Sequence, residues 1–239
     1  MNNSAQNSST SDRSTRIASP IHTALVLSFL CAWAFWRKIA IDHLSIAANP
    51  SRVRYYWSGI LFEWLLFFFI LAGFRRTGAS IDIIVGDRWH SVGEVLRDIG
   101  IAAGFWAVTL GLNWLIGSLL HVAAHGPHLQ FLAPQRGVEL VWWIALSITA
   151  GICEETIFRG YLQRQFLAMT KSVPMAILLS AATFGAAHAY QGFRMVILIG
   201  LFGAMFGLLA HWRGNVRPGM IAHAWQDSFN GVLATIMKS

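Results

Sequence analysis

The chain has 239 residues, of which 55% are hydrophobic and only 12% are charged, and its formal net charge is +7. So little polar surface excludes a soluble domain of this length and indicates an all-α polytopic membrane protein. The charge does not indicate nucleic-acid binding, because Lys and Arg gather in the short connections between apolar runs, as in loops of membrane proteins. We therefore expect the lipid bilayer as a partner and no nucleic acid.

The first 20 residues, 1–20, are rich in Ser and Asn and lack apolar periodicity, which predicts a disordered tail. A spanning helix needs about 20 mostly apolar residues. About seven runs meet this condition, at 21–36, 58–74, 99–121, 138–170, 173–190, 193–212 and 217–237. The sequence therefore predicts a bundle of about seven to eight transmembrane helices.

The region 21–137 is interpreted as N-terminal transmembrane helices with interfacial segments. The first run is followed by Arg37 and Lys38 instead of a cleavage site, so we interpret it as a retained helix. Residues 39–57 and 75–98 mix charges with short apolar runs, which favours loops or segments at the membrane surface. Glu63, near the edge of the second run, either reaches the interface or faces the bundle interior.

The region 138–237 carries the polar residues that are candidates for catalysis or ligand binding. Glu154 and Glu155 follow sixteen mostly apolar residues without a loop signal, so a helix that enters lipid at Val138 holds them at membrane depth. A charged carboxylate there costs about 2.5–3.5 kcal/mol, which makes an intramembrane pair a functional hypothesis. Arg159 lies four residues after Glu155 and can pair with it, whereas Glu154 has no such local partner.

Two histidines lie in the apolar helices that follow. His188 ends the pattern F-G-A-A-H, and His223 begins H-A-W-Q-D, so His223 and Asp227 leave the same face of the last helix. If the chain turns near Lys171, Glu154 and His188 both lie about 17 residues from that turn, at the same depth of a helical hairpin. The glycines of 193–212, at positions 200, 203 and 207, predict close helix packing.

This residue set can activate water. A glutamate removed from water can act as a general base near neutral pH. Two histidines and a third acidic or amide group can bind Zn²⁺ or donate hydrogen bonds to an oxyanion. In lipid, such chemistry indicates hydrolysis of a substrate that arrives through the membrane.

The patterns E-E-T-I-F-R-G, F-x-x-x-H and H-x-x-x-D together resemble the CPBP family of intramembrane proteases, which includes the type II CAAX prenyl endopeptidases and the bacterial abortive-infection and bacteriocin-immunity proteins. The resemblance covers about residues 138–230, and 138–237 would form a CPBP-like catalytic core. It also implies that the helix bundle encloses an intramembrane polar cavity. The last motif often ends in Asn in that family and ends in Asp227 here.

The resemblance implies that a water activated by a glutamate attacks a peptide bond of a membrane-associated, for example lipidated, substrate near its C-terminus. By position, Glu154 would be the general base and His188 and His223 the oxyanion or metal partners. Asp227 would be the last polar member, and Glu155 and Arg159 the supporting pair. The same four residues, Glu154, His188, His223 and Asp227, would hold Zn²⁺ if a metal is used, and the spacing does not choose between a metalloprotease and a mechanism without metal.

Two other functions remain open at this point. A non-catalytic member of the same fold would act as an immunity or scaffold protein, and a proton-coupled transporter would use Glu63, Glu154 and Asp227 as a relay. In every case the sequence predicts a multi-pass integral membrane protein, which in a bacterium would lie in the inner membrane.

Overall fold

The structure, a computed structural model, describes residues 17–46, 52–76, 78, 80–119, 132–135 and 137–236. The greater part of the predicted disordered tail, 1–16, lies outside the described residues. The longer elements of the described chain are helices: α1 (Pro20–Ile46), α2 (Arg52–Arg75), α3 (Asp82–Val85), α4 (Val92–Leu119), α6 (Gly137–Glu154), the π-helix η1 (Glu155–Leu162), α7 (Gln163–Thr170), α8 (Val173–Ala187), the 3-10 turn η2 (Ala189–Gln191), α9 (Phe193–Arg213) and α10 (Arg217–Ile236).

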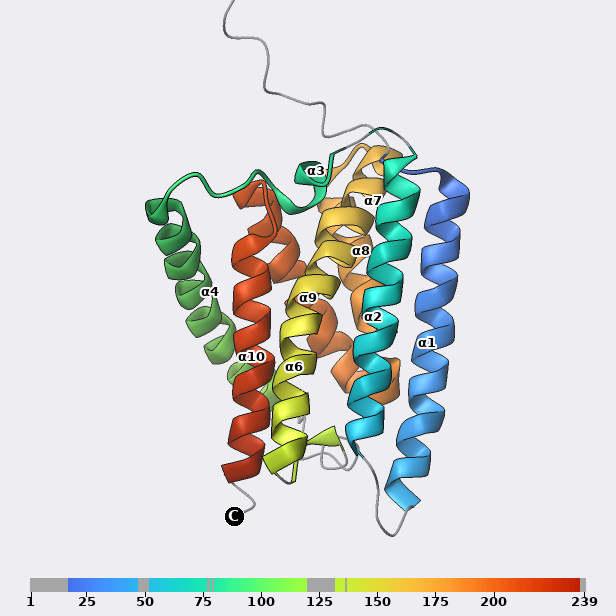
Figure 1. Cartoon of the computed structure of the whole chain (residues 1–239), viewed down its shortest axis with the longest axis vertical. Coiled ribbons are helices and arrows are strands. Elements are labelled where there is room, and N and C mark those ends of the chain that lie inside the picture. The colour runs from blue at the N-terminus through green and yellow to red at the C-terminus, as the bar shows by residue number, and fades with distance from the viewer. Residues whose placement is uncertain are drawn as a thin grey trace, which may run out of the picture.

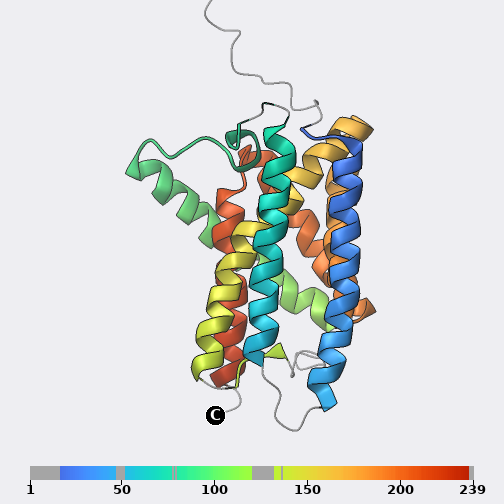
Figure 2. The ribbon, with the colours of Figure 1, turned by 45° about the vertical axis from the view of Figure 1, so that its right-hand side comes forward.

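The long helices run up and down along the longest axis of the molecule (Figure 1). α1 and α2 form an antiparallel pair on one side, and α6 lies between α2 and α10, against both of which it packs. The chain continues from α6 through η1 and α7 to the turn at Lys171, and α8 and α9 then form a closely packed hairpin. Rotation of the view shows α4 tilted away from the other helices (Figure 2).

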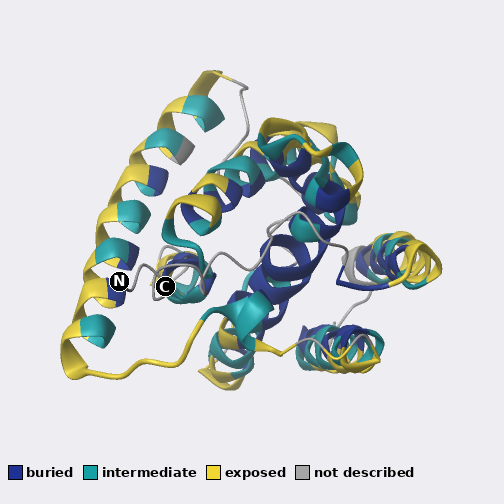
Figure 3. Cartoon of the chain, turned by 90° about the horizontal axis from the view of Figure 1, so that it is seen from above, coloured by how far each residue is buried: buried dark blue, intermediate teal, exposed yellow. Residues whose placement is uncertain are grey.

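The outer surface fits a lipid environment. Five helical segments are long and apolar enough to cross a membrane: Pro20–His43, Arg52–Arg75, Val92–Leu119, Gly137–Thr170 and Phe193–Arg213. Large apolar side chains such as Leu65, Phe68 and Trp114 face outward. Seen from above, buried residues lie on the inner faces of the helices, and α4 is largely exposed (Figure 3). The chain is therefore an integral membrane protein with an all-α fold.

The predicted loop after the first apolar run is wrong in its boundaries. α1 continues through Arg37 and Lys38 to Ile46, and α2 already begins at Arg52. Lys38 pairs with Asp42 one turn later, at 2.6 Å, and Arg37 is buried against aromatic rings. Because of these contacts, the charges of Arg37 and Lys38 fit within α1 and do not end it.

Two further boundaries differ from the prediction. α4 begins at Val92, so the last part of the predicted surface segment 75–98 is helical, and only the short helix α3 and its flanking turns lie outside the spans. Asp98 is buried there because it accepts hydrogen bonds from Trp89 and Arg213. α8 ends at Ala187, short of the predicted residue 190, and its 15 residues reach about 22 Å.

The predicted turn and glycine packing are confirmed. Lys171 adopts a left-handed conformation with φ of 56°, and the next helix, α8, has a proline in its first turn. On α9, a Cβ atom at Gly203 would lie 3.1 Å from the Cα atom of Ala181 on α8. The hairpin therefore closes tightly because glycine presents no side chain at this contact.

Candidate active site

The region around Glu154 is built on a change of helix type. α6 ends at Glu154 and continues as the π-helix η1, whose eight residues are all buried. The wider π turn leaves backbone carbonyls with altered partners, and the Phe158 carbonyl accepts a hydrogen bond from the Ser180 hydroxyl of α8 at 2.8 Å. Such insertions are frequent at functional sites.

A polar stripe on η1 and α7 faces the glycines of α9. Arg159 donates a hydrogen bond to the Gly203 carbonyl at 3.3 Å, and one turn later Gln163 donates one to the Gly207 carbonyl at 3.1 Å. Arg159 also pairs with Glu155 at 2.9 Å, as the spacing predicted. The glycines therefore admit two long polar side chains to the backbone of the neighbouring helix.

Glu155 holds His223 of α10 in place. The Nδ1 atom of His223 lies 3.0 Å from Oε1 of Glu155. Because a carboxylate only accepts, we assign the proton on Nδ1 to this hydrogen bond. The opposite nitrogen, Nε2, consequently points toward Glu154.

Glu154 lies between the two histidines. Its Oε1 atom is 3.9 Å from Nε2 of His188, and its Oε2 atom is 3.7 Å from Nε2 of His223. Both distances exceed that of a hydrogen bond. The Glu154 carboxylate therefore faces two imidazole edges while its oxygens stay available to another molecule.

His188 reaches this position from the end of α8. It is the C-cap residue of that helix, and its Nδ1 atom lies 2.9 Å from the Phe184 carbonyl, to which it donates. The matched depth predicted for Glu154 and His188 is thus confirmed. His223 reaches the same place from α10, with its Nε2 atom 3.7 Å from Oε2 of Glu154.

Asp227 lies at the edge of this group. Its Oδ2 atom is 3.5 Å from Nε2 of His223, and its side chain is 36% exposed. The predicted shared face of α10 is therefore present. The Asp227 carbonyl accepts a hydrogen bond from the Trp143 indole at 2.7 Å, which fixes α10 against α6.

A cavity of about 40 Å³ opens beside Glu154 and His188. A volume of this size holds a small number of water molecules. Its walls combine apolar side chains with charged ones and come from α1, α2, α6, η1, α8 and η2: Leu30, Trp33, Arg37, Phe62, Glu63, Glu154, Ile157, Phe158, Ala187, His188 and Tyr190. The predicted intramembrane polar cavity is therefore present, and Glu63 faces the bundle interior rather than the membrane interface.

Arg37 belongs to this cavity, a position that sequence reasoning missed. A pair of basic residues after an apolar run is typical of a helix end, so Arg37 was expected outside the bundle. Only the aromatic residues nearby, Trp33 and Tyr55, could have indicated that a guanidinium is accommodated in the interior.

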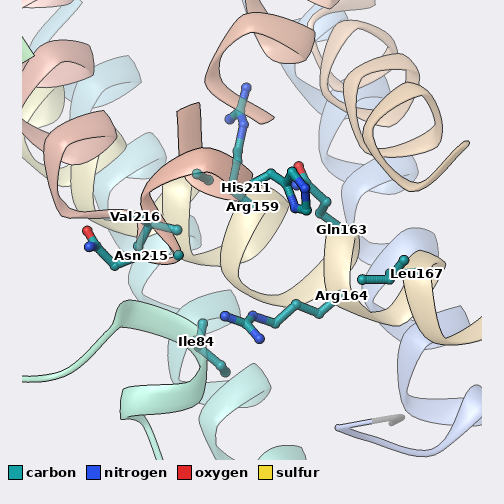
Figure 4. A pocket seen from close by; sticks show the side chains of 10 residues that line it. Ile84, Arg159, Gln163, Arg164, Leu167, His211, Asn215 and Val216 are labelled. Carbon is teal, nitrogen blue, oxygen red and sulfur yellow. The ribbon is translucent and has the colours of Figure 1, made fainter. Parts of the chain in front are cut away.

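A second pocket lies nearer the turn between α9 and α10 (Figure 4). It is lined by Arg164, His211 and Asn215 among others, and it contains no carboxylate. In Figure 4 the guanidinium of Arg159 points away from Arg164 and Ile84, toward the bundle interior. This pocket therefore does not offer a carboxylate base of the kind that Glu154 provides.

The side chains around Glu154 are not arranged as a set of metal ligands in the described residues. In the part of the chain that the structure describes, no group of three or more His, Cys, Asp or Glu side chains is arranged to hold a metal ion. Zinc bound by Glu154, His188, His223 and Asp227 stays a prediction from the sequence. Hydrolysis with Glu154 as the base needs only side chains of this chain.

Comparison with known proteins agrees with the resemblance seen in the motifs. Residues 135–229 match the family model described as type II CAAX prenyl endopeptidase Rce1-like. No curated protein and no solved structure matches the chain. The matched segment includes Glu154, Glu155, His188, His223 and Asp227. This part of the chain is therefore similar to the Rce1-like type II CAAX prenyl endopeptidases.

Proposed function

We propose that the chain is an intramembrane endopeptidase in which Glu154 activates a water molecule for attack on a peptide bond. One observation carries this proposal. The Glu154 carboxylate lies beside a cavity that can hold water, with an imidazole Nε2 atom 3.7 Å from one oxygen and another 3.9 Å from the other. A base, space for the attacking water and two potential hydrogen-bond donors thus meet at one place.

The reaction follows from these positions. Glu154 takes a proton from the water as its oxygen bonds to the substrate carbonyl carbon. The carbonyl oxygen becomes an oxyanion, which His223 and His188 stabilise by hydrogen bonds from Nε2–H when protonated there. The C–N bond then breaks, and the proton held by Glu154 passes to the leaving amine. One water is consumed, and a new carboxylate and a new amine are formed.

Glu155 and Arg159 position these groups rather than react. Glu155 is fully buried and bonded to both Arg159 and His223, so its charge is compensated. It keeps the His223 ring turned so that Nε2 faces Glu154. Removing either partner of such a buried pair costs about 3–5 kcal/mol of stability.

The substrate class follows from the location of the cavity and from the family. A cavity walled by Trp33, Phe62 and Leu30 within the bundle favours a peptide that enters from the membrane. The matched family is described as prenyl endopeptidases. We therefore propose a membrane-associated peptide or protein with a lipidated C-terminal region as the substrate.

The test is cleavage of a quenched fluorescent farnesylated peptide by purified protein in detergent, with the products identified by mass spectrometry. We expect the wild type to cleave the peptide and Glu154→Gln to lower kcat by about 10²- to 10⁴-fold, because the general base is lost. A parallel assay with a chelator distinguishes this mechanism from a zinc-dependent one.

The matched control is Glu139→Gln. Glu139 lies on the same helix, is buried, and pairs with Arg52 at 3.8 Å, away from the cavity. Its folded fraction should cleave at the wild-type rate. Equal rates for wild type and folded Glu154→Gln protein would contradict the proposal, and a folded wild type without any cleavage would favour an immunity or scaffold role.

A further inference from the structure

Two charged side chains in the cavity come from helices outside the matched segment 135–229. Arg37 of α1 and Glu63 of α2 line the same cavity as Glu154 and His188. Neither is part of the catalytic arrangement described above. Their placement in the bundle interior therefore calls for a separate explanation.

Arg37 is a buried cation with an unsatisfied donor. Arg37 is only 7% exposed, and its Nε atom has no hydrogen-bond partner. The ion pairs among the described residues do not include Arg37. Its contacts are neutral groups. The Tyr55 carbonyl lies at 3.3 Å, and the ring centroids of Tyr55, Tyr190 and Trp33 lie 3.5, 5.1 and 5.6 Å from Cζ.

Glu63 is the complementary acceptor. Its Oε2 atom is buried and has no hydrogen-bond partner. Its charge interacts with those of Glu154 and Arg37, but it does not approach Arg37 closely enough to form an ion pair. The cavity thus presents an unused donor on α1 and an unused acceptor on α2, and burying such groups without partners is unfavourable.

A peptide group satisfies both. Its carbonyl accepts and its N–H donates, and in the trans form these two groups point in opposite directions. One peptide group can therefore bridge a donor and an acceptor that come from different helices. An anionic ligand suits Arg37 but not Glu63, and a cationic ligand suits Glu63 but not Arg37.

We propose that Arg37 and Glu63 form a binding subsite for one backbone peptide group of the substrate, next to the peptide bond that Glu154 hydrolyses. This inference rests on the proposed function. Arg37 donates to the carbonyl of that group, and Glu63 accepts its N–H. The two residues position the substrate and take no part in bond breaking.

The experiment measures binding without cleavage. Glu154→Gln protein in detergent is titrated with a fluorescein-labelled farnesylated hexapeptide and with ester analogues in which one backbone N–H at a time is replaced by oxygen. We expect one ester position to raise Kd by about 10-fold or more, because a hydrogen bond to a charged group is lost. The other ester positions should bind like the parent peptide.

Variants of Arg37 and Glu63 show whether these residues cause the weaker binding of the sensitive ester. In the Glu63→Leu background the parent peptide and the sensitive ester should have the same Kd, whereas Glu63→Gln, which keeps an acceptor, should preserve the difference. Arg37→Met should reduce the difference at the same position, because an ester carbonyl is also a weaker acceptor. Asp42→Asn, in the exposed pair with Lys38 on α1, is the control and should behave like its parent.

Three results would overturn the subsite. They are equal binding of all esters by Glu154→Gln protein, an ester effect that is unchanged by Glu63→Leu, and no binding of any peptide. Cleavage of the parent peptide by the wild type is measured separately. The experiments can therefore refute the subsite while the protease activity is confirmed. They can equally confirm the subsite while no protease activity is found.

Discussion

Glu154 and Glu155 are neighbours in the chain but have different surroundings. Glu155 is fully buried and bonded to Arg159 and His223. The Glu154 side chain is 14% exposed, and its oxygens lie beyond hydrogen-bond distance of the two histidines. We infer that the two adjacent carboxylates take two roles because their environments differ: Glu155 orients His223, and Glu154 acts on water.

The role of Asp227 can be tested by two substitutions. In the structure, Oδ2 of Asp227 lies 3.5 Å from Nε2 of His223. Asp227→Asn keeps an oxygen acceptor at this place and removes the negative charge. We expect kcat within about 10-fold of the wild type, since at most one hydrogen bond is weakened. Asp227→Ala should lose more. Steady-state cleavage of the farnesylated peptide measures both, and an Asn variant as slow as the Ala variant would show that the carboxylate itself is required.

At the residue scale, contacts within one helix and the shared depth of Glu154 and His188 could be predicted, but the cavity residues of α1 and α2 could not. The pairs Glu155–Arg159 and His223–Asp227 follow from the pitch of a helix, which brings residues four apart together. Arg37 and Glu63 reach the cavity only because α1 continues past its basic residues and α2 packs beside η1. No spacing in the sequence contains that information.

At the scale of elements, glycines set how closely the helices of the site approach. A Cβ atom at Gly151 of α6 would lie 2.6 Å from the Met220 carbonyl of α10. α10 carries His223, and α6 ends at Glu154, so this contact helps to set the separation of the two side chains. The wider turns of η1 then direct Glu155 and Arg159 into the interior.

This contact predicts a destabilising effect of Gly151→Ala. The added methyl group meets backbone that cannot move aside, so we expect a loss of about 1–3 kcal/mol of stability and a lower melting temperature. Gly104→Ala is the matched control. Gly104 lies on α4 with no atom within 4 Å of the added Cβ, so the change should be neutral or favourable by up to about 1 kcal/mol. Thermal melting in detergent measures both, and equal melting temperatures would refute the close α6–α10 contact.

The element boundaries show where sequence reasoning was sufficient. The turn at Lys171 was predictable because a polar pair followed by proline interrupts two apolar runs. The end of α1 was not, because Arg37 indicates a helix end unless the aromatic residues that surround it in the fold are known. The π-helix was also missed, since the pattern E-E-T-I-F-R-G suits an ordinary α-helix equally well.

At the scale of the whole molecule, the proposed catalytic residues and one wall of the cavity come from different parts of the chain. The segment 135–229 matches the Rce1-like family and contains Glu154, His188 and His223. The cavity beside them is closed by α1 and α2, through Trp33, Arg37, Phe62 and Glu63. We infer that the C-terminal helices provide the chemistry and that the N-terminal pair shapes the space for the substrate.

The central claim is that water attacks the peptide bond directly while Glu154 acts as its base. The most direct measurement is a single turnover of the farnesylated peptide in H₂¹⁸O with enzyme in excess, followed by mass spectrometry of the products and of the peptide that contains Glu154. Direct attack predicts one ¹⁸O atom in the new carboxylate of the product and none in Glu154. A product without ¹⁸O, together with ¹⁸O in the Glu154 side chain, would mean that Glu154 attacks the substrate itself and would contradict this account.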